Sequence, residues 1–197
     1  MTASRPAWLH AVNGATLVAI LAVAAVVLHT TPTREMQQSA VRVAGAIGET
    51  TSGRNIRATV DSVELAEAVT AGNGWAGTTP GVWVVVELQV EALVDDEGVF
   101  LGTALLQIGD VSYAASVRPQ TASLANGRLI TGIPVTGPLM FELPVDAVSG
   151  RDAAAAQLQL AVNDDPRADS LLVMPVDLDA LTVQSSLEVD YPEWGQR

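Results

Sequence analysis

The side chains that most often perform catalysis are nearly absent from this chain. Its two histidines, His10 and His29, flank an apolar segment near the N-terminus, and it contains no cysteine and no lysine. A serine nucleophile needs a nearby base, normally histidine or lysine. A zinc site needs histidine or thiolate ligands. We therefore predict no catalytic residue, no metal site and no cofactor, and we do not expect an enzyme.

Carboxylates are the remaining groups that could do chemistry. Acidic residues gather at 95–97, at Asp164 and Asp165, and at Asp177 and Asp179. Calcium prefers such hard oxygen ligands, but the chain lacks the Asp-x-Asp-x-Asp-Gly loop of a calcium-binding hand. No spacing singles out the pair of acids that glycoside hydrolysis requires. We read these groups as solvated turns, and whether the acidic loops bind calcium stays open at this stage.

Three aromatic residues outside the expected strands are the candidate partner-binding residues. Trp75 lies in residues 72–81, which contain four glycines and which we expect to form a flexible loop. It is either tucked under a sheet or displayed to a partner, because loops carry recognition on rigid scaffolds. Tyr191 and Trp194 lie in the C-terminal tail, which either packs back on the domain or serves as a docking peptide. Exposed aromatic patches are costly, which favours packing.

The charge of the chain limits its partners. Of its 197 residues, 49% are hydrophobic, and the formal net charge is −12. The part after His29 holds nine arginines and all 22 acidic residues, a net charge of −13. Such a surface repels phosphates, so we expect no nucleic-acid partner. We interpret the excess of acidic residues as a means of keeping the domain soluble, in preference to a site that recognises a basic partner.

An apolar segment near the N-terminus is long enough to cross a membrane. The uncharged run at 15–28 would be a helix of about 21 Å, shorter than a hydrocarbon core of about 30 Å. Counted from Trp8 to His29, the helix is about 33 Å long, with Trp8 placed as an interfacial anchor. The alternative is a cleaved signal peptide. No Ala-x-Ala pattern directly follows residue 28, which favours an uncleaved anchor.

These observations predict a single-pass plasma-membrane protein whose C-terminal domain is extracytoplasmic. The expected parts are a short cytoplasmic N-terminus at 1–7, the anchor at 8–29, a polar stalk at 30–38, a domain at 39–190 and a tail at 191–197.

Beyond the stalk the sequence changes to the two-residue alternation of β-strands. The strongest strand, at 82–91, begins as a continuous apolar run and ends in strict alternation, as a central strand does. Within 56–65 the apolar positions shift by one residue relative to the two-residue alternation, which predicts a β-bulge. Further strands are expected at 41–47, 100–108, 111–117, 128–135, 139–143, 157–162 and 181–189, with one helical turn near 152–157. Short strands separated by turn residues predict an all-β sandwich or barrel.

Residues 60–160 resemble a known family. The pieces that carry the likeness are ATVDSV at 58–63, GVWVVVELQV at 81–90, GPLMFELP at 137–144 and QLQL at 157–160. They resemble the telokin-like domains of actinobacterial secreted and membrane-anchored proteins of unknown function. Ala92-Leu93 departs from the family pattern, which often has an Asn there, and the lipoprotein cysteine is absent. The resemblance implies an immunoglobulin-like antiparallel β-sandwich, preceded here by one N-terminal transmembrane helix, and an exported location; it transfers no catalytic residue.

The first functional hypothesis is therefore a membrane-tethered extracytoplasmic module that binds an envelope protein, as an accessory to an envelope or transport machine. The alternative is a small-ligand carrier, for which we see less support. A carrier needs a sizeable apolar pocket with a few convergent polar groups. A protein-binding module needs an exposed apolar patch or an unpaired sheet edge.

Alkaline carbonate extraction tests the predicted anchor. We expect the full-length chain in the membrane pellet, because an uncleaved apolar helix of this length stays in the bilayer. Recovery of a soluble chain whose N-terminus lies beyond residue 28 would show a cleaved signal instead.

Overall fold

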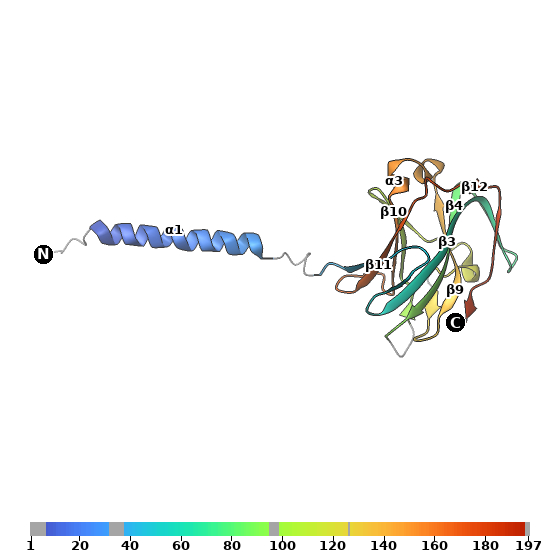
Figure 1. The fold of residues 1–197 in the computed structure, drawn as a ribbon, viewed down its shortest axis with the longest axis horizontal. Coiled ribbons are helices and arrows are strands. Elements are labelled where there is room, and N and C mark those ends of the chain that lie inside the picture. Colours follow the sequence, from blue (N-terminus) through green and yellow to red (C-terminus); the bar gives the residue numbers. More distant parts are fainter. Residues whose placement is uncertain (1–6, 32–37, 95–98, 126, 196–197) are drawn as a thin grey trace. The chain divides into compact units, whose positions relative to one another are not determined.

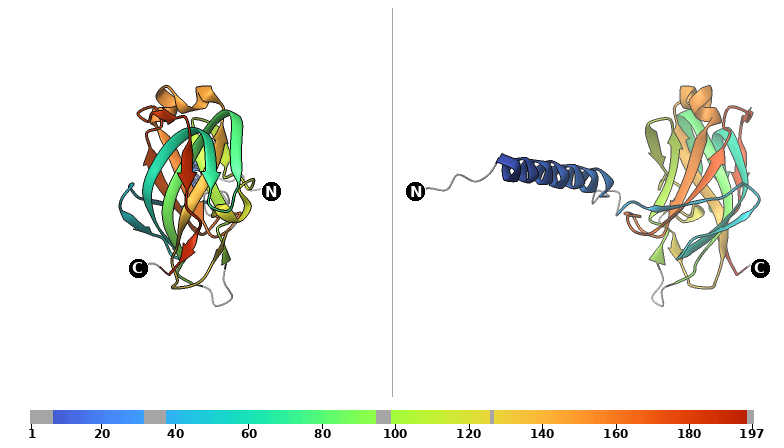
Figure 2. Two further views of the ribbon diagram at one scale, coloured as in Figure 1. Left: turned by 90° about the vertical axis from the view of Figure 1, so that its right-hand side faces the viewer. Right: turned by 60° about the vertical axis from the view of Figure 1, so that its left-hand side comes forward.

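The computed structural model of the chain describes residues 7–31, 38–94, 99–125 and 127–195. The chain divides into two compact units, Met1–Gln38 and Ser39–Arg197. The first contains a helix and the second is a β-sandwich, as Figures 1 and 2 show. The acidic group at 95–97, most of the predicted N-terminal segment and most of the stalk lie outside the described residues.

Helix α1, Ala7–Thr30, forms the described part of the first unit. Within it, Ala11–Thr30 has a mean hydropathy of 2.4, and none of it is buried in the protein. At about 1.5 Å per residue the helix is about 36 Å long. The predicted apolar N-terminal helix is confirmed, one residue longer at each end than expected. A membrane anchor and a signal sequence both meet this criterion of length and composition.

The second unit is built from strands. These are β1 (Val41–Ala44), β2 (Thr50–Ser52), β3 (Ile56–Ala71), β4 (Ala76–Ala92), β5 (Val99–Phe100), β6 (Thr103–Ile108), β7 (Val111–Ala114), β8 (Arg128–Leu129), β9 (Val135–Leu143), β10 (Ala156–Ala161), β11 (Ser170–Val176), β12 (Val183–Gln184), β13 (Leu187–Val189) and β14 (Glu193–Trp194). Short helical turns lie at η1 (Gln120–Ala122), η2 (Val145–Val148) and α3 (Arg151–Ala154).

Two sheets face each other to make the sandwich. One has the order β1-β11-β10-β6-β7. In the other, which we call the long sheet, β4 lies between β3 and β9; β2, β12 and β13 pair with the outer edge of β3, and β14 pairs with β9. The central pairings are antiparallel, whereas β1 pairs with β11, and β12 and β13 with β3, in parallel. The predicted all-β antiparallel sandwich is confirmed, with parallel strands added at its edges.

The main core fills the space between the two sheets. Val84, Val86 and Leu88 point inward from β4, and Phe141 of β9 and Leu158 of β10 meet them there, all without exposed surface. Full burial of such side chains stabilises the fold by about 1.5–3 kcal/mol each. The continuous apolar run of β4 is therefore explained by its place at the centre of the long sheet.

A β-bulge keeps the apolar side chains of β3 on the inner face. Val60 pairs with Leu88, the register shifts before Ser62, and Val63 then pairs with Val86. Without the extra residue, every side chain that follows would change face. The parity slip in the sequence predicted this bulge, and the prediction is confirmed.

Several expected segments differ from the structure. The single strands expected at 100–108 and 181–189 are each divided into two short strands, and the strands expected at 41–47 and 111–117 end at Ala44 and Ala114. Residues 72–81 are not a long flexible loop, because β3 extends to Ala71 and β4 already begins at Ala76. The turn between them is tight: Gly74 has a φ of +84°, and the Ala71 N–H donates to the Trp75 carbonyl at 2.9 Å. The strand expected at 128–135 ends at Leu129, because the chain turns sharply at 130–133.

Strand β11 was not expected at all. Its sequence, SLLVMPV, does not alternate, because both of its faces are buried. Leu172 and Met174 face the main core, whereas Leu171 and Val173 pack with Ala161 in a small cluster on the outer face.

Asp169 ties together two turns at one end of the sandwich. Its carboxylate accepts hydrogen bonds from Arg54 at 3.0 Å, Asn55 at 2.6 Å, Asn163 at 2.7 Å and the N–H of Ser170 at 2.7 Å. Its burial opposes ionisation, but the hydrogen bonds from Ser170, Arg54 and Asn55 outweigh burial and lower the pKa of Asp169.

Replacing Asp169 with alanine tests this connection. We expect Asp169→Ala to lower the free energy of unfolding of the fragment 39–197 by about 3 kcal/mol near neutral pH, because it leaves buried donors without an acceptor. Because the pKa of Asp169 is lowered in the fold, its contribution is present above its ordinary pKa and fades as pH falls through the lowered value. Urea titrations across the acidic range measure this.

The matched control is Asp165→Ala, whose carboxylate pairs with Arg167 on the surface. This variant should unfold like the wild type. An Asp169→Ala variant as stable as the control would contradict the structural role of Asp169.

Candidate functional site

The outer face of the long sheet is divided into an apolar half and a polar half. Because side chains alternate along a strand, every second residue of β4 points away from the core. In chain order these are Trp83, Val85, Glu87, Gln89 and Glu91. The first two are buried under other parts of the chain, and the last three lie in or beside surface depressions.

Trp75 covers the apolar half. Its ring meets the buried ring of Trp83 edge to face, with the centroids 5.6 Å apart and the planes at 86°. Gly77 lies directly beneath Trp75, and a Cβ at this glycine would collide with the indole. Of the two alternatives left open for Trp75, the structure has it packed on the sheet, half-buried.

The rest of the apolar half is covered from three directions. The β3–β4 hairpin folds over it, the C-terminal segment runs beside the hairpin, and the turn η1 approaches from the β9 side (Figure 1). The residues that these three segments contribute to the cover are Val69, Ala71, Ala122, Leu187 and Val189. This second apolar cluster closes half of a sheet face that would otherwise be open to solvent.

Arg118 holds the margin of this cluster. Its guanidinium carbon lies 5.4 Å from the centroid of the Trp83 ring, a cation–π arrangement worth about 0.5–1 kcal/mol. Glu142 fixes the guanidinium through an ion pair of 2.5 Å, and Ser116 donates to the same carboxylate at 2.8 Å. The position of Arg118 is therefore set by its partners.

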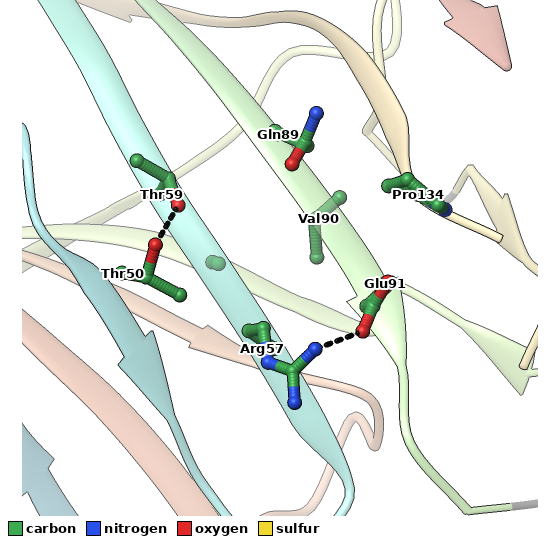
Figure 3. Close-up of a pocket in the computed structure, with 8 residues that line it drawn as sticks. Thr50, Arg57, Thr59, Gln89, Val90, Glu91 and Pro134 are labelled. Atoms are coloured by element: carbon green, nitrogen blue, oxygen red, sulfur yellow. Dashed lines mark hydrogen bonds and ion pairs between the residues drawn. The ribbon is translucent and has the colours of Figure 1, made fainter. Parts of the chain in front are cut away.

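The polar half contains a groove of about 480 Å³, shown in Figure 3. Its lining residues are Thr50, Arg57, Ala58, Thr59, Gln89, Val90, Glu91 and Pro134. The Arg57 guanidinium pairs with Glu91 at 2.6 Å, and the hydroxyls of Thr50 and Thr59 are 2.9 Å apart. The groove thus offers hydrogen-bonding groups from β2, β3 and β4 on one surface.

Beside the groove, carboxylates converge on Glu87. Burial, followed by the charges of Asp190, Asp61 and Glu64, raises the pKa of Glu87 to about 7. A second depression, of about 440 Å³, is lined by Glu87, Thr136, Gly137, Asp190, Tyr191 and Glu193. Glu87 therefore changes its charge near neutral pH.

The C-terminal tail crosses this polar half. Strand β14 pairs with β9, so that Glu193 lies opposite Thr136 and Trp194 opposite Val135. Tyr191 is 44% exposed and Trp194 is 45% exposed. The tail thus packs back on the domain, as the cost of exposed aromatics favours, yet both rings stay partly open to solvent.

The three predicted partner-binding residues are thereby brought to one sheet, Trp75 on its covered half, Tyr191 beside Glu87 and Trp194 on its edge strand. The groove residues were not predicted as site residues. The outward positions Glu87, Gln89 and Glu91 were a usable signal, because three polar residues on one side of a strongly apolar strand indicate an uncovered surface.

The described acidic loops have local partners. The N–H of Ala180 donates to Asp177 at 3.1 Å, the N–H of Gly150 donates to Asp179 at 2.7 Å, and Asp165 pairs with Arg167. Within the described ranges, no cluster of three or more His, Asp or Glu side chains could hold a metal ion.

The fold and helix define a β-sandwich domain that follows one N-terminal apolar helix. Neither a protein-family model nor a curated protein sequence matches the chain. Among solved structures, the YjhA protein from Bacillus subtilis is similar, with 19% identity, a TM-score of 0.46 and coverage of 67% of this chain and 99% of that one.

Two further structures are similar in the same way. A predicted lipoprotein from Staphylococcus aureus has 9% identity and a TM-score of 0.45, over 73% of this chain and 97% of its own. An uncharacterized β-sandwich protein from Clostridium difficile has 11% identity and a TM-score of 0.44, over 74% of this chain and 99% of its own.

The packing of Trp75 is testable by truncation. We expect Trp75→Ala to lower the free energy of unfolding by about 2 kcal/mol, because it uncovers Trp83 and leaves a cavity. Trp194→Ala is the matched control at the edge of the same sheet and should cost about 0.5 kcal/mol, in the range of surface substitutions. Urea denaturation followed by far-UV circular dichroism gives both values. Equal effects of the two variants would mean that Trp75 does not close the cluster.

Proposed function

We propose that this protein is a single-pass, membrane-tethered, extracytoplasmic module of the immunoglobulin-like, telokin-like type, and that it acts by binding another protein of the cell envelope. In this proposal it is an accessory to an envelope or transport machine, held by α1 in the plasma membrane, and it performs no catalysis. The length and composition of α1 support the tether. A tether raises the local concentration of the domain near partners in the same membrane.

The observation that carries this proposal is the open groove on the polar half of the outer face of the long sheet. The chain covers the other half of this face with a hairpin and a C-terminal segment, but leaves the groove between Thr50 and Pro134 open. Arginine and aromatic residues are enriched in protein interfaces, and here Arg57 lies in the groove while Tyr191 and Trp194 lie beside it. A protein surface with complementary hydrogen-bonding groups fits this groove.

The packing between the sheets favours a protein partner over the alternative of a small-ligand carrier. Carrier sites are concave and mostly apolar. In this domain the facing sides of the sheets are occupied by their own side chains, such as Leu88, Leu106 and Phe141, which have no exposed surface. The depressions on the long sheet instead combine threonine, arginine, glutamine and carboxylate side chains with a few apolar residues such as Val90 and Pro134.

Site-specific photo-crosslinking in intact cells tests the binding face. A photoreactive residue at Thr59, on the groove, should join the full-length protein to an envelope protein that mass spectrometry can identify. The matched control is Gln159 on β10, which is likewise half-buried but belongs to the opposite sheet. Crosslinks from Gln159 with none from Thr59 would place the interface elsewhere and refute the proposed face. A crosslinked species should also disappear in Arg57→Glu, which reverses the charge in the groove.

A further inference from the structure

Residues 190–195, which we call the C-terminal strap, lie across the outer face of the long sheet. Just before it, Val189 is 3% exposed and pairs with Ala71, so the chain is firmly held up to that point. The strap then passes Glu87 of β4 and reaches the edge of β9 on the other side of the sheet. The boundary between Val189 and Asp190 is therefore a natural hinge.

The strap is mostly exposed, and Pro192 is its one half-buried residue among positions 190–195. Its strand, β14, consists of Glu193 and Trp194 alone, and the N–H of Gly195 donates to the Pro134 carbonyl at 2.9 Å. Pro192 packs on Gly137, where a Cβ would come within 3.0 Å of the proline Cα. The depression of about 440 Å³ lies between the strap and the sheet, so Tyr191 does not fill the space above Glu87. Segments with few buried contacts open at low free-energy cost.

The groups that face Glu87 carry the same charge. From β3 these are Asp61 and Glu64, and from the strap they are Asp190 and Glu193, together with the phenol of Tyr191. Strand β9 contributes Thr136, Gly137 and Pro138, which have no charge.

Two polar side chains nearby bond to carboxylates other than Glu87. Gln184 of β12 donates to Glu64 at 2.6 Å, and Arg57, further along β3, is paired with Glu91. No arginine is among the residues that line the depression. The strap therefore closes over a carboxylate that repels it whenever both are ionised.

We propose that the C-terminal strap is a proton-operated cover: it lies on the sheet while Glu87 is protonated, and it swings away at the Val189–Asp190 hinge when Glu87 is ionised. Opening uncovers Thr136 and Glu87 and extends the adjoining groove past Gln89, so the strap regulates the surface assigned to partner binding. The motion itself requires no partner and is tested without one.

The pKa of Glu87 places this transition near neutral pH. Burial and the neighbouring carboxylates raise it to about 7. Because the closed form has the higher pKa, it binds more protons than the open form, so it is favoured as pH falls and lost as pH rises through about 7.

Amide hydrogen exchange of the full-length protein in detergent micelles tests the strap. After correction for intrinsic exchange rates, the segments 132–140 and 190–195 should exchange about fivefold faster at about pH 8 than at about pH 6. Segment 156–161 of β10 should show no such change. Glu87→Gln removes the titrating group and should keep the strap protected at both pH values.

The matched control variant is Glu91→Gln, which removes a carboxylate from the same face of the same strand but one that pairs with Arg57. It should open with pH as the wild type does. Asp190→Asn, an exposed change that does not threaten the fold, should reduce the opening at high pH by about half or more. Equal protection of the wild-type strap at both pH values, or wild-type opening in Glu87→Gln, would overturn the proposal. Loss of crosslinking at Thr59 would instead count against the proposed partner face and leave this result unaffected.

Discussion

The structure depends on the burial of strand β4 between β3 and β9 in the long sheet. Its inward side chains Val84, Val86 and Leu88 are fully buried, and they fix which side of the strand faces the opposite sheet. Once that side is fixed, the alternation of the strand decides what the other side presents. The outward residues of β4 are apolar in its first half and polar in its second half. The apolar half of the sheet face must therefore be covered by other parts of the chain, whereas the polar half can remain in contact with water. The hairpin, the C-terminal segment and the groove all follow from this division.

The excess of negative charge shapes the polar half. Four arginines of the domain, at positions 54, 57, 118 and 167, form ion pairs with carboxylates. Among the described residues no arginine pairs with Glu87, and burial acts together with the repulsion from its neighbours. A protein with few cations thus keeps one half-buried carboxylate whose charge changes in the neutral range. We regard this as the main electrostatic feature of the outer face.

Local patterns were sufficient to predict much of the fold. The alternation at 82–91 and the parity slip near Asp61 are encoded within a few residues, so the central strand and its bulge could be read directly. Strand β11 could not, because its apolar residues face two separate clusters and leave no alternation. The glycine-rich sequence at 72–81 was interpreted as a flexible loop. In the structure Gly74 allows a tight turn, and Gly77 leaves room for the ring of Trp75.

The candidate site was harder to predict for a different reason. Thr50, Gln89 and Pro134 are far apart in the chain, and only the pairing of β2, β3, β4 and β9 brings them to one groove. Leu187 and Val189, which help to cover Trp83, lie within the last dozen residues of the chain. During synthesis the surface around this indole therefore stays partly exposed until residues 187–189 have been made. A nascent chain that stalls before residue 187 would expose an apolar sheet surface. Such surfaces are bound by chaperones and promote aggregation.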